Sequence, residues 1–183
     1  MKYIEPWQPY PLEVTLSDKQ RSPERLAAVI EQFRLPENPR YTPRALSKDG
    51  TQATFCNIFL WDFTRAMSCE IPHWAWANGA PAPVGRGKEL NANQIVAWLG
   101  QYGHHYGWRK LTEEEARGAA VQGYPCVVVW QHHGGIGHVA AVRGGSDGIT
   151  HIAQAGSSNF ERGALSRGFG RLKAPALEFW MHL

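Results

Sequence analysis

The sequence predicts an α+β fold in which helices come first and an antiparallel sheet follows. Two observations support this prediction. Apolar residues recur at helical spacing over residues 22–123, whereas short apolar runs alternate with glycine-rich turns after residue 126. Helices followed by a run of strands are typical of an α+β domain, and 183 residues suit one such domain.

Three prolines near the N-terminus predict an extended segment before the first helix. Ser22 is suited to cap that helix and Pro23 to open it, and its apolar spacing continues to about Leu35. We expect residues 1–35 to be an N-terminal extension and helix that forms one unit with the main domain, residues 36–183.

The second helix is expected to be central and largely buried, because almost every third or fourth residue in it is apolar. Thr54 is the expected cap, so that the helix runs from Phe55 to about Cys69, and Pro72 follows its end. Residues 73–87 then form a long loop.

Two further helices and four strands complete the predicted elements. Either Asn91 or Asn93 caps the third helix, and Thr112 with Glu115 forms a capping box for the fourth, which Gly123 ends. Glycine-rich turns between the first three strands imply antiparallel pairing. The strands are expected over residues 127–131, 138–143, 150–154 and 177–182.

Cys56 is the candidate nucleophile. In the predicted helix it occupies the second position, where free backbone N–H groups and the helix dipole favour an anion. Such an environment lowers the pKa of a thiol. The same N–H groups can donate to an oxyanion, so one helix terminus can serve both parts of an acyl transfer.

A thiolate nucleophile needs an imidazole within hydrogen-bond reach and a group that orients the imidazole. His138 is favoured among the eight histidines, because it opens a strand directly after the turn Gly135-Ile136-Gly137. Gln154 lies on the next strand, where its amide can hold the second ring nitrogen if the two strands pair. The alternatives are a buried structural cysteine, a turn histidine and an ordinary strand-end amide.

Three short motifs carry a family resemblance, namely Thr54-Phe55-Cys56-Asn57, Gly137-His138-Val139-Ala140 and Ile152-Ala153-Gln154-Ala155-Gly156. In this order they resemble the NlpC/P60 and CHAP group of papain-like peptidoglycan amidases and endopeptidases. The resemblance implies a papain-like fold with the nucleophile helix packed on the sheet, a Cys-His-Gln type triad, and hydrolysis of cell-wall peptide through a thioester. It also implies a tyrosine beside the oxyanion, for which Tyr41 is the candidate.

Other residues are candidates for substrate contact. Asn57 follows the nucleophile at the oxyanion site, and Trp61 is expected on the exposed face of the same helix with Asp62 and Arg65. Trp74 lies in the long aromatic loop, where it could line a groove or tether the loop to the core.

The odd number of cysteines argues against a disulfide framework. Cys56 and Cys69 are expected about 20 Å apart along one helix, which is too far for a bridge, whereas a Cys69–Cys126 bridge is left open. Adjacent histidines such as His132 and His133 point to opposite faces of a strand, so no metal and no other cofactor is expected.

The net charge of +3 is spread along the chain, which argues against a nucleic-acid partner. No stretch approaches the roughly 18 apolar residues of a membrane span, and no secretory signal is visible. We expect synthesis in the cytoplasm and action on the cell wall or in the periplasm after release or export. Peptidoglycan peptide is the expected substrate of a lysin or antibacterial effector, for which an inhibitor or immunity protein is a candidate partner.

Two other functions are compatible with the sequence. The same triad could transfer acyl groups or deamidate protein substrates, as transglutaminase-like and deamidating toxins do. A non-catalytic wall-binding or peptide-binding module would instead use the aromatic loop, and its Cys56 would be unreactive.

Overall fold

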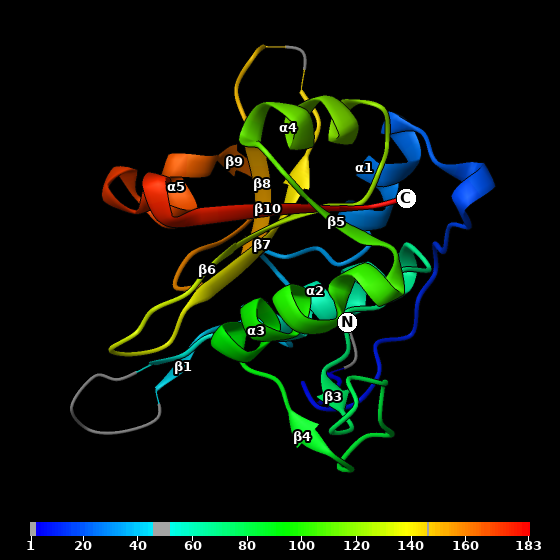
Figure 1. Cartoon of the computed structure of the whole chain (residues 1–183), viewed down its shortest axis with the longest axis vertical. Helices are drawn as coiled ribbons and strands as arrows, with labels where there is room; N and C mark the ends of the chain where they lie inside the picture. Colours follow the sequence, from blue (N-terminus) through cyan, green and yellow to red (C-terminus); the bar gives the residue numbers. More distant parts are fainter. Residues whose placement is uncertain (1–2, 46–51, 146) are drawn as a thin grey trace.

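The computed structural model describes residues 3–45, 52–145 and 147–183. Within these ranges, six strands form an antiparallel sheet in the order β5-β10-β6-β7-β8-β9 (Figure 1). The predicted α+β class is therefore confirmed. The strands of this sheet are β5 (Trp108–Leu111), β6 (Cys126–Trp130), β7 (His138–Arg143), β8 (His151–Ala155), β9 (Asn159–Ala164) and β10 (Leu177–His182).

Helices lie on both sides of this sheet. The helices α2 and α3 contact the central strands from below in the view of Figure 1, and α4 contacts them from above. Among the described residues, no helix combines the length and apolar character that a membrane span requires. The helices are α1 (Pro23–Glu31), α2 (Cys56–Ala66), α3 (Ala92–Tyr102), α4 (Glu113–Val121) and α5 (Leu165–Phe169).

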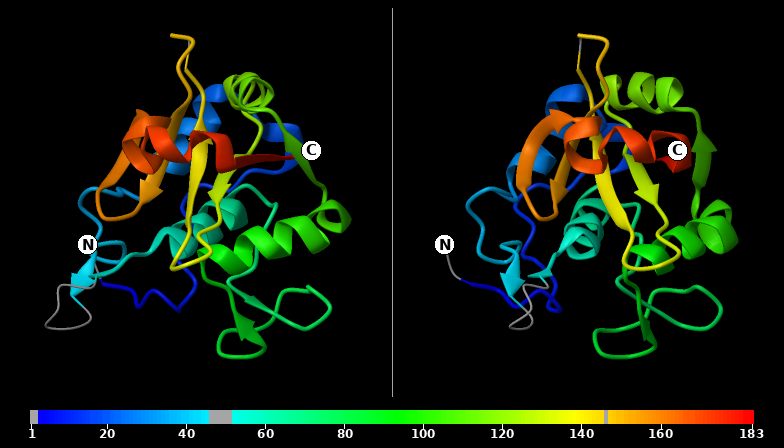
Figure 2. Two further views of the ribbon diagram at one scale, coloured as in Figure 1. Left: turned by 60° about the vertical axis from the view of Figure 1, so that its left-hand side comes forward. Right: turned by 90° about the vertical axis from the view of Figure 1, so that its left-hand side faces the viewer.

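The remaining regular structure is small. Two short hairpins, β1–β2 and β3–β4, extend from the side of the molecule on which α2 and α3 lie, as both views in Figure 2 show. Near the N-terminus, α1 contacts both α2 and α4, so this segment packs onto the rest of the fold. The hairpin strands are β1 (Arg44–Ala45), β2 (Gln52–Ala53), β3 (Trp74–Ala75) and β4 (Lys88–Glu89).

Three of the predicted helix caps are confirmed. Ser22, Asn91 and Thr112 each accept a hydrogen bond from the backbone N–H three residues later. Asn91 rather than Asn93 is therefore the cap of α3. Gly123 follows α4 with a φ of +89°, a left-handed conformation that glycine adopts without strain.

The predicted boundaries of α2 were wrong at both ends. Phe55 is the N-cap and Cys56 is the first helical residue, so Thr54 lies before the helix and does not cap it. The helix ends at Ala66, and Ser68 then adopts a φ of +55°. This left-handed residue turns the chain out of the helix well before the proline that was expected to end it.

The predicted strands are present, whereas β5 and β9 of the main sheet and the four short hairpin strands were missed. The meander β6–β7–β8 pairs as expected, and β10 lies between β5 and β6. β9 was missed because its buried apolar residue Phe160 is followed by a polar run and Gly163, which hides the alternation. β5 is a short edge strand that exposes Arg109 and Lys110, and such charged edges are usual in natural sheets.

A buried ion pair ties the N-terminal segment to α2. The Nε of Arg40 lies 2.8 Å from Asp62 Oδ2, and both side chains are fully buried. The Arg40 guanidinium also donates to the carbonyl oxygens of Glu5 and Gln8, and the Tyr41 hydroxyl donates to Asp62. Burial raises the pKa of Asp62, and the Arg40 and Tyr41 contacts only partly offset it. The prediction that Asp62 lies on an exposed face was therefore wrong.

We expect Arg40→Ala to lower the free energy of unfolding by roughly 3–5 kcal/mol, because it leaves the Asp62 carboxylate buried without its partner. Urea unfolding followed by circular dichroism measures the loss. Arg109→Ala, at an exposed position of β5, is the matched control, with an expected change within about 0.5 kcal/mol. Equal effects of the two substitutions would contradict the assigned role of Arg40.

Candidate active site

The structure brings Cys56, His138 and Gln154 together from three elements. Cys56 opens α2, His138 opens β7 and Gln154 lies on β8. The His138 ring lies close enough to the Cys56 thiol for each group to shift the pKa of the other, and its Nε2 lies 2.8 Å from Gln154 Oε1. The Gln154 Nε2 donates to the carbonyl oxygen of Ser158, so Oε1 is the atom that accepts from the imidazole. Nε2 of His138 therefore carries a proton, and Nδ1 is the nitrogen left for the thiol.

The electrostatics of the pair shift both groups toward their charged forms. Burial raises the pKa of the Cys56 thiol, but the His138 hydrogen bond and charge and the N–H groups of Val139 and Asn57 outweigh burial, so this pKa lies below its ordinary value. Burial lowers the pKa of His138, but the contacts with Cys56 and Gln154 raise it above its ordinary value. Cys56 is only 3% exposed, whereas His138 is partly exposed, so the imidazole is the more accessible partner.

Strand register explains why Gln154 reaches His138. In the β7–β8 pair, Ala141 lies opposite Ala153, and the pairing covers only residues Ala141 to Arg143 of β7. Gln154 is consequently diagonal to His138 on the same face of the sheet, within reach of an imidazole ring. Pairing with β8 stops before the first residues of β7, so the backbone around Val139 is open to α2. The N–H of Val139 can then donate to the Cys56 sulfur.

The loop before His138 is held by Asn93, which the sequence suggested only as a helix cap. Its Nδ2 donates to the carbonyl oxygens of His132 and Gly135, at 3.0 and 2.8 Å, and its Oδ1 accepts from the N–H of His132. A Cβ on Gly137 would lie 2.5 Å from this Oδ1 and 2.3 Å from a backbone oxygen. The glycine and the asparagine together fix the point where β7 begins.

Small and aromatic residues enclose the imidazole and the amide. A Cβ on Gly156 would lie 3.2 Å from His138 Cε1, and one on Gly168 would lie 2.3 Å from Gln154 Oε1. Phe169 is 1% exposed, and its ring centroid lies 4.8 Å from that of His138. Sequence reasoning missed Gly168 and Phe169, whereas Gly156 ends the third of the quoted motifs. A glycine inside a helix, as Gly168 is in α5, is the available sequence signal for such a close approach.

Tyr41 does not lie at the oxyanion position, contrary to the expectation. Its side chain is fully buried, and its hydroxyl donates to Asp62 Oδ2 at 2.9 Å, nearly two turns along α2 from Cys56. The groups that lower the pKa of the Cys56 thiol are instead His138 and the backbone N–H groups of Val139 and Asn57. A tyrosine whose hydroxyl is held by a buried carboxylate cannot also serve the nucleophile.

The expected substrate contacts of Trp61 were also wrong. Its side chain is 5% exposed, its Nε1 donates to Glu70, and its ring packs against His73. Trp74 is half-buried and packs edge-on against the other side of His73, with ring centroids 5.3 Å apart. Both indoles therefore belong to the packing around a buried histidine whose pKa burial lowers to about 4.

Asn57 lies beside the nucleophile but its side chain points away. Its Nδ2 donates to the carbonyl oxygen of Leu90 at 3.0 Å, so the amide joins α2 to the segment before α3. Its backbone N–H, not its side chain, contacts the Cys56 sulfur. Asn57 therefore lowers the pKa of the Cys56 thiol through its backbone N–H and not through its side chain.

Neither protein-family models nor curated proteins match the sequence. Among the residues that the structure describes, no group of three or more histidine, cysteine, aspartate or glutamate side chains could hold a metal ion. All three cysteines are free thiols, so the bridge between Cys69 and Cys126 is not formed in this structure.

The thiols differ in a way that alkylation can measure. We expect iodoacetamide at about pH 7 to modify Cys56 selectively, because burial raises the pKa of Cys126 to about 12 and that of Cys69 further still. The rate should fall only as pH drops through the lowered pKa of Cys56, below the ordinary value of about 8.5. Peptide mapping by mass spectrometry gives the rate at each cysteine.

His138→Ala is the informative variant in this experiment, with an expected decrease in Cys56 labelling of about tenfold, because it removes the hydrogen bond and charge that stabilise the thiolate. An unchanged rate, or equal labelling of all three cysteines, would argue against an activated thiol.

Gly168→Ala tests the enclosure of Gln154 and His138. The added Cβ cannot share space with Gln154 Oε1, so we expect the His138–Gln154 hydrogen bond to break and Cys56 labelling to slow several-fold. Gly118→Ala in α4 is the matched control, since the space beyond its Cα is open, and it should stabilise the protein by about 0.5–1 kcal/mol. Wild-type labelling in Gly168→Ala would show that the close contact has no bearing on the thiol.

Proposed function

We propose that this protein is a cysteine amidase or endopeptidase that cleaves amide bonds in peptidoglycan peptide. The proposal is carried by the arrangement in which Cys56, at the first position of α2, lies beside His138, whose ring is hydrogen-bonded to Gln154. A nucleophile on a helix, a histidine at a strand start and a polar residue on the next strand follow the papain-like order, and we propose that type of fold. The three motifs that resemble the NlpC/P60 and CHAP group support peptidoglycan as the substrate.

In the proposed reaction, the Cys56 thiolate attacks the amide carbonyl carbon, and the C–S bond forms as the carbonyl electrons move to oxygen. Backbone N–H groups at the start of α2 donate to this oxyanion. The C–N bond then breaks, and the leaving nitrogen takes the proton of the His138 imidazolium. A thioester and a free amine result.

The second half of the reaction hydrolyses the thioester and regenerates the free enzyme. Neutral His138 takes a proton from a water molecule whose oxygen attacks the thioester carbonyl. The C–S bond breaks, the thiolate is restored beside the imidazolium, and a carboxylic acid leaves. Gln154 keeps the ring in the required tautomer throughout, because its Oε1 holds the proton of Nε2.

Purified sacculi provide the test. We expect the wild-type protein to release peptide fragments with new amino and carboxyl groups, identified by mass spectrometry, and Cys56→Ala to reduce the rate more than about a thousandfold. Circular dichroism checks that the variant is folded. Cleavage by Cys56→Ala at the wild-type rate would remove the nucleophile assignment.

Cys69→Ala is the matched control, since it deletes a buried thiol that lies outside the triad, and it should keep its activity. The same preparations are incubated with protein substrates that contain accessible glutamines. Deamidated or transamidated protein, with intact sacculi, would replace the proposal by an acyl-transfer or deamidating function.

A further inference from the structure

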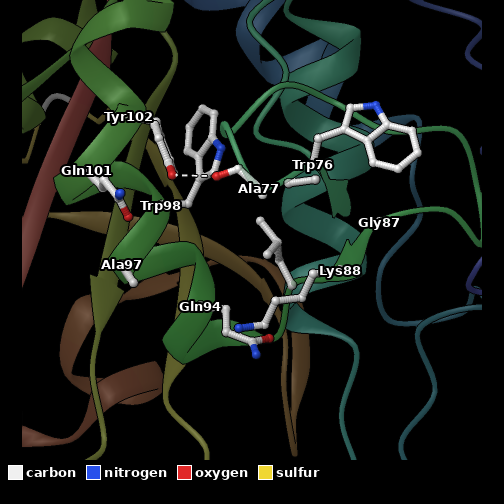
Figure 3. Close-up of a pocket in the computed structure, with 11 residues that line it drawn as sticks. Trp76, Ala77, Gly87, Lys88, Gln94, Ala97, Trp98, Gln101 and Tyr102 are labelled. Atoms are coloured by element: carbon white, nitrogen blue, oxygen red, sulfur yellow. Dashed lines mark hydrogen bonds between the residues drawn. The ribbon is translucent and has the colours of Figure 1, made fainter.

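A groove lies between α3 and the β3–β4 hairpin, outside the triad. Its volume is about 530 Å³, within the range of small-molecule sites. Figure 3 shows Trp98 and Tyr102 on the α3 side, and Trp76 and Lys88 on the hairpin side. Trp76 is 46% exposed, whereas Trp98 is buried. The groove therefore has an indole that is free to meet a ligand.

Hydrogen bonds within the protein hold the walls of this groove in place without a ligand. Trp98 Nε1 donates to the carbonyl oxygen of Gly79 at 2.8 Å. The Tyr102 hydroxyl donates to that of Ala77 at 2.9 Å, as Figure 3 shows. Gly79 has a φ of +83°, and a Cβ there would lie 2.4 Å from the Tyr102 ring. The hairpin is thus held against α3 at a fixed distance. A ligand that binds here therefore loses little affinity to the ordering of the hairpin.

The groove reaches the neighbourhood of the nucleophile. Leu90 lines it, and the carbonyl oxygen of Leu90 accepts from the side chain of Asn57, the residue after Cys56. Gln94 also lines it, and the preceding residue, Asn93, holds the loop that leads to His138. The groove is therefore linked through Leu90 and Asn57 to the start of α2, and through Gln94 and Asn93 to the loop before His138.

We infer that this groove binds an N-acetylated sugar of the glycan strand that carries the peptide, an inference that rests on the proposed function. The apolar face of a sugar ring matches an exposed indole such as Trp76. An acetamido group has one donor and one acceptor, and the amides of Gln94 and Gln101 offer both. Lys88 supplies a donor for hydroxyl oxygens, and its side chain extends toward Gln94 (Figure 3).

The lining favours a neutral, partly apolar ligand over an ionic one. Lys88 provides the charge among the lining residues that the structure describes, and alanine side chains form much of the remaining surface. A polyanion would need several cations, whereas a sugar needs a flat apolar surface and a few polar groups at its edges. The groove provides such an apolar surface and such polar groups.

Isothermal titration with N,N′,N″-triacetylchitotriose tests the inference on the full chain. We expect the wild-type protein to bind and Trp76→Ala to bind at least about tenfold more weakly. Trp7→Ala is the matched control, because it removes an equally exposed indole from the N-terminal segment, 49% exposed, and it should bind as the wild type does. Cellotriose, which lacks the acetamido groups, should bind more weakly than chitotriose.

The outcomes separate this inference from the proposed function. Cys56→Ala should bind chitotriose as the wild type does while it no longer cleaves sacculi. Cleavage without chitotriose binding would overturn the groove assignment and leave the hydrolase intact, whereas binding without cleavage would do the reverse. Equal affinity of wild type and Trp76→Ala, or of chitotriose and cellotriose, would also overturn the sugar assignment.

Discussion

The contact between the Cys56 thiol at the start of α2 and the His138 imidazole at the start of β7 joins the helical part of this protein to its sheet. Both groups are largely removed from water, and burial opposes a charge on either of them. A thiolate and an imidazolium can persist there only if each compensates the other and both keep their hydrogen bonds. Residues on several sides of the pair supply these contacts.

Each neighbour of the Cys56–His138 pair holds one part of it in place. Asn93 holds the loop that precedes His138, and Gln154 holds the far side of the ring. Glycines at positions 156 and 168 leave room for the ring and the amide, where any larger side chain would displace them. Further along α2, Arg40 and Asp62 anchor the N-terminal segment, so the helix that begins with Cys56 is fixed at both its start and its middle.

Local signals predicted much of the fold. The caps at Ser22 and Thr112 were confirmed, because a cap depends on a side chain and a backbone group only three residues away. The meander was confirmed for a similar reason, since short glycine turns leave neighbouring strands little choice but to pair. β9 was missed because its identity as a strand comes from pairing with β8 rather than from its own apolar pattern.

For the candidate site, the sequence by itself selected Cys56, His138 and Gln154, because their places at a helix start and on adjacent strands are local features. Their chemical roles stay predictions. Only the tertiary structure decided that the Tyr41 hydroxyl donates to Asp62 and that Trp61 is buried. It also decided that Asn93 holds the loop before His138 and that Gly168 and Phe169 pack against Gln154 and His138. These contacts join residues far apart in the chain, and whether a side chain meets a partner across such a distance depends on packing that no local pattern encodes.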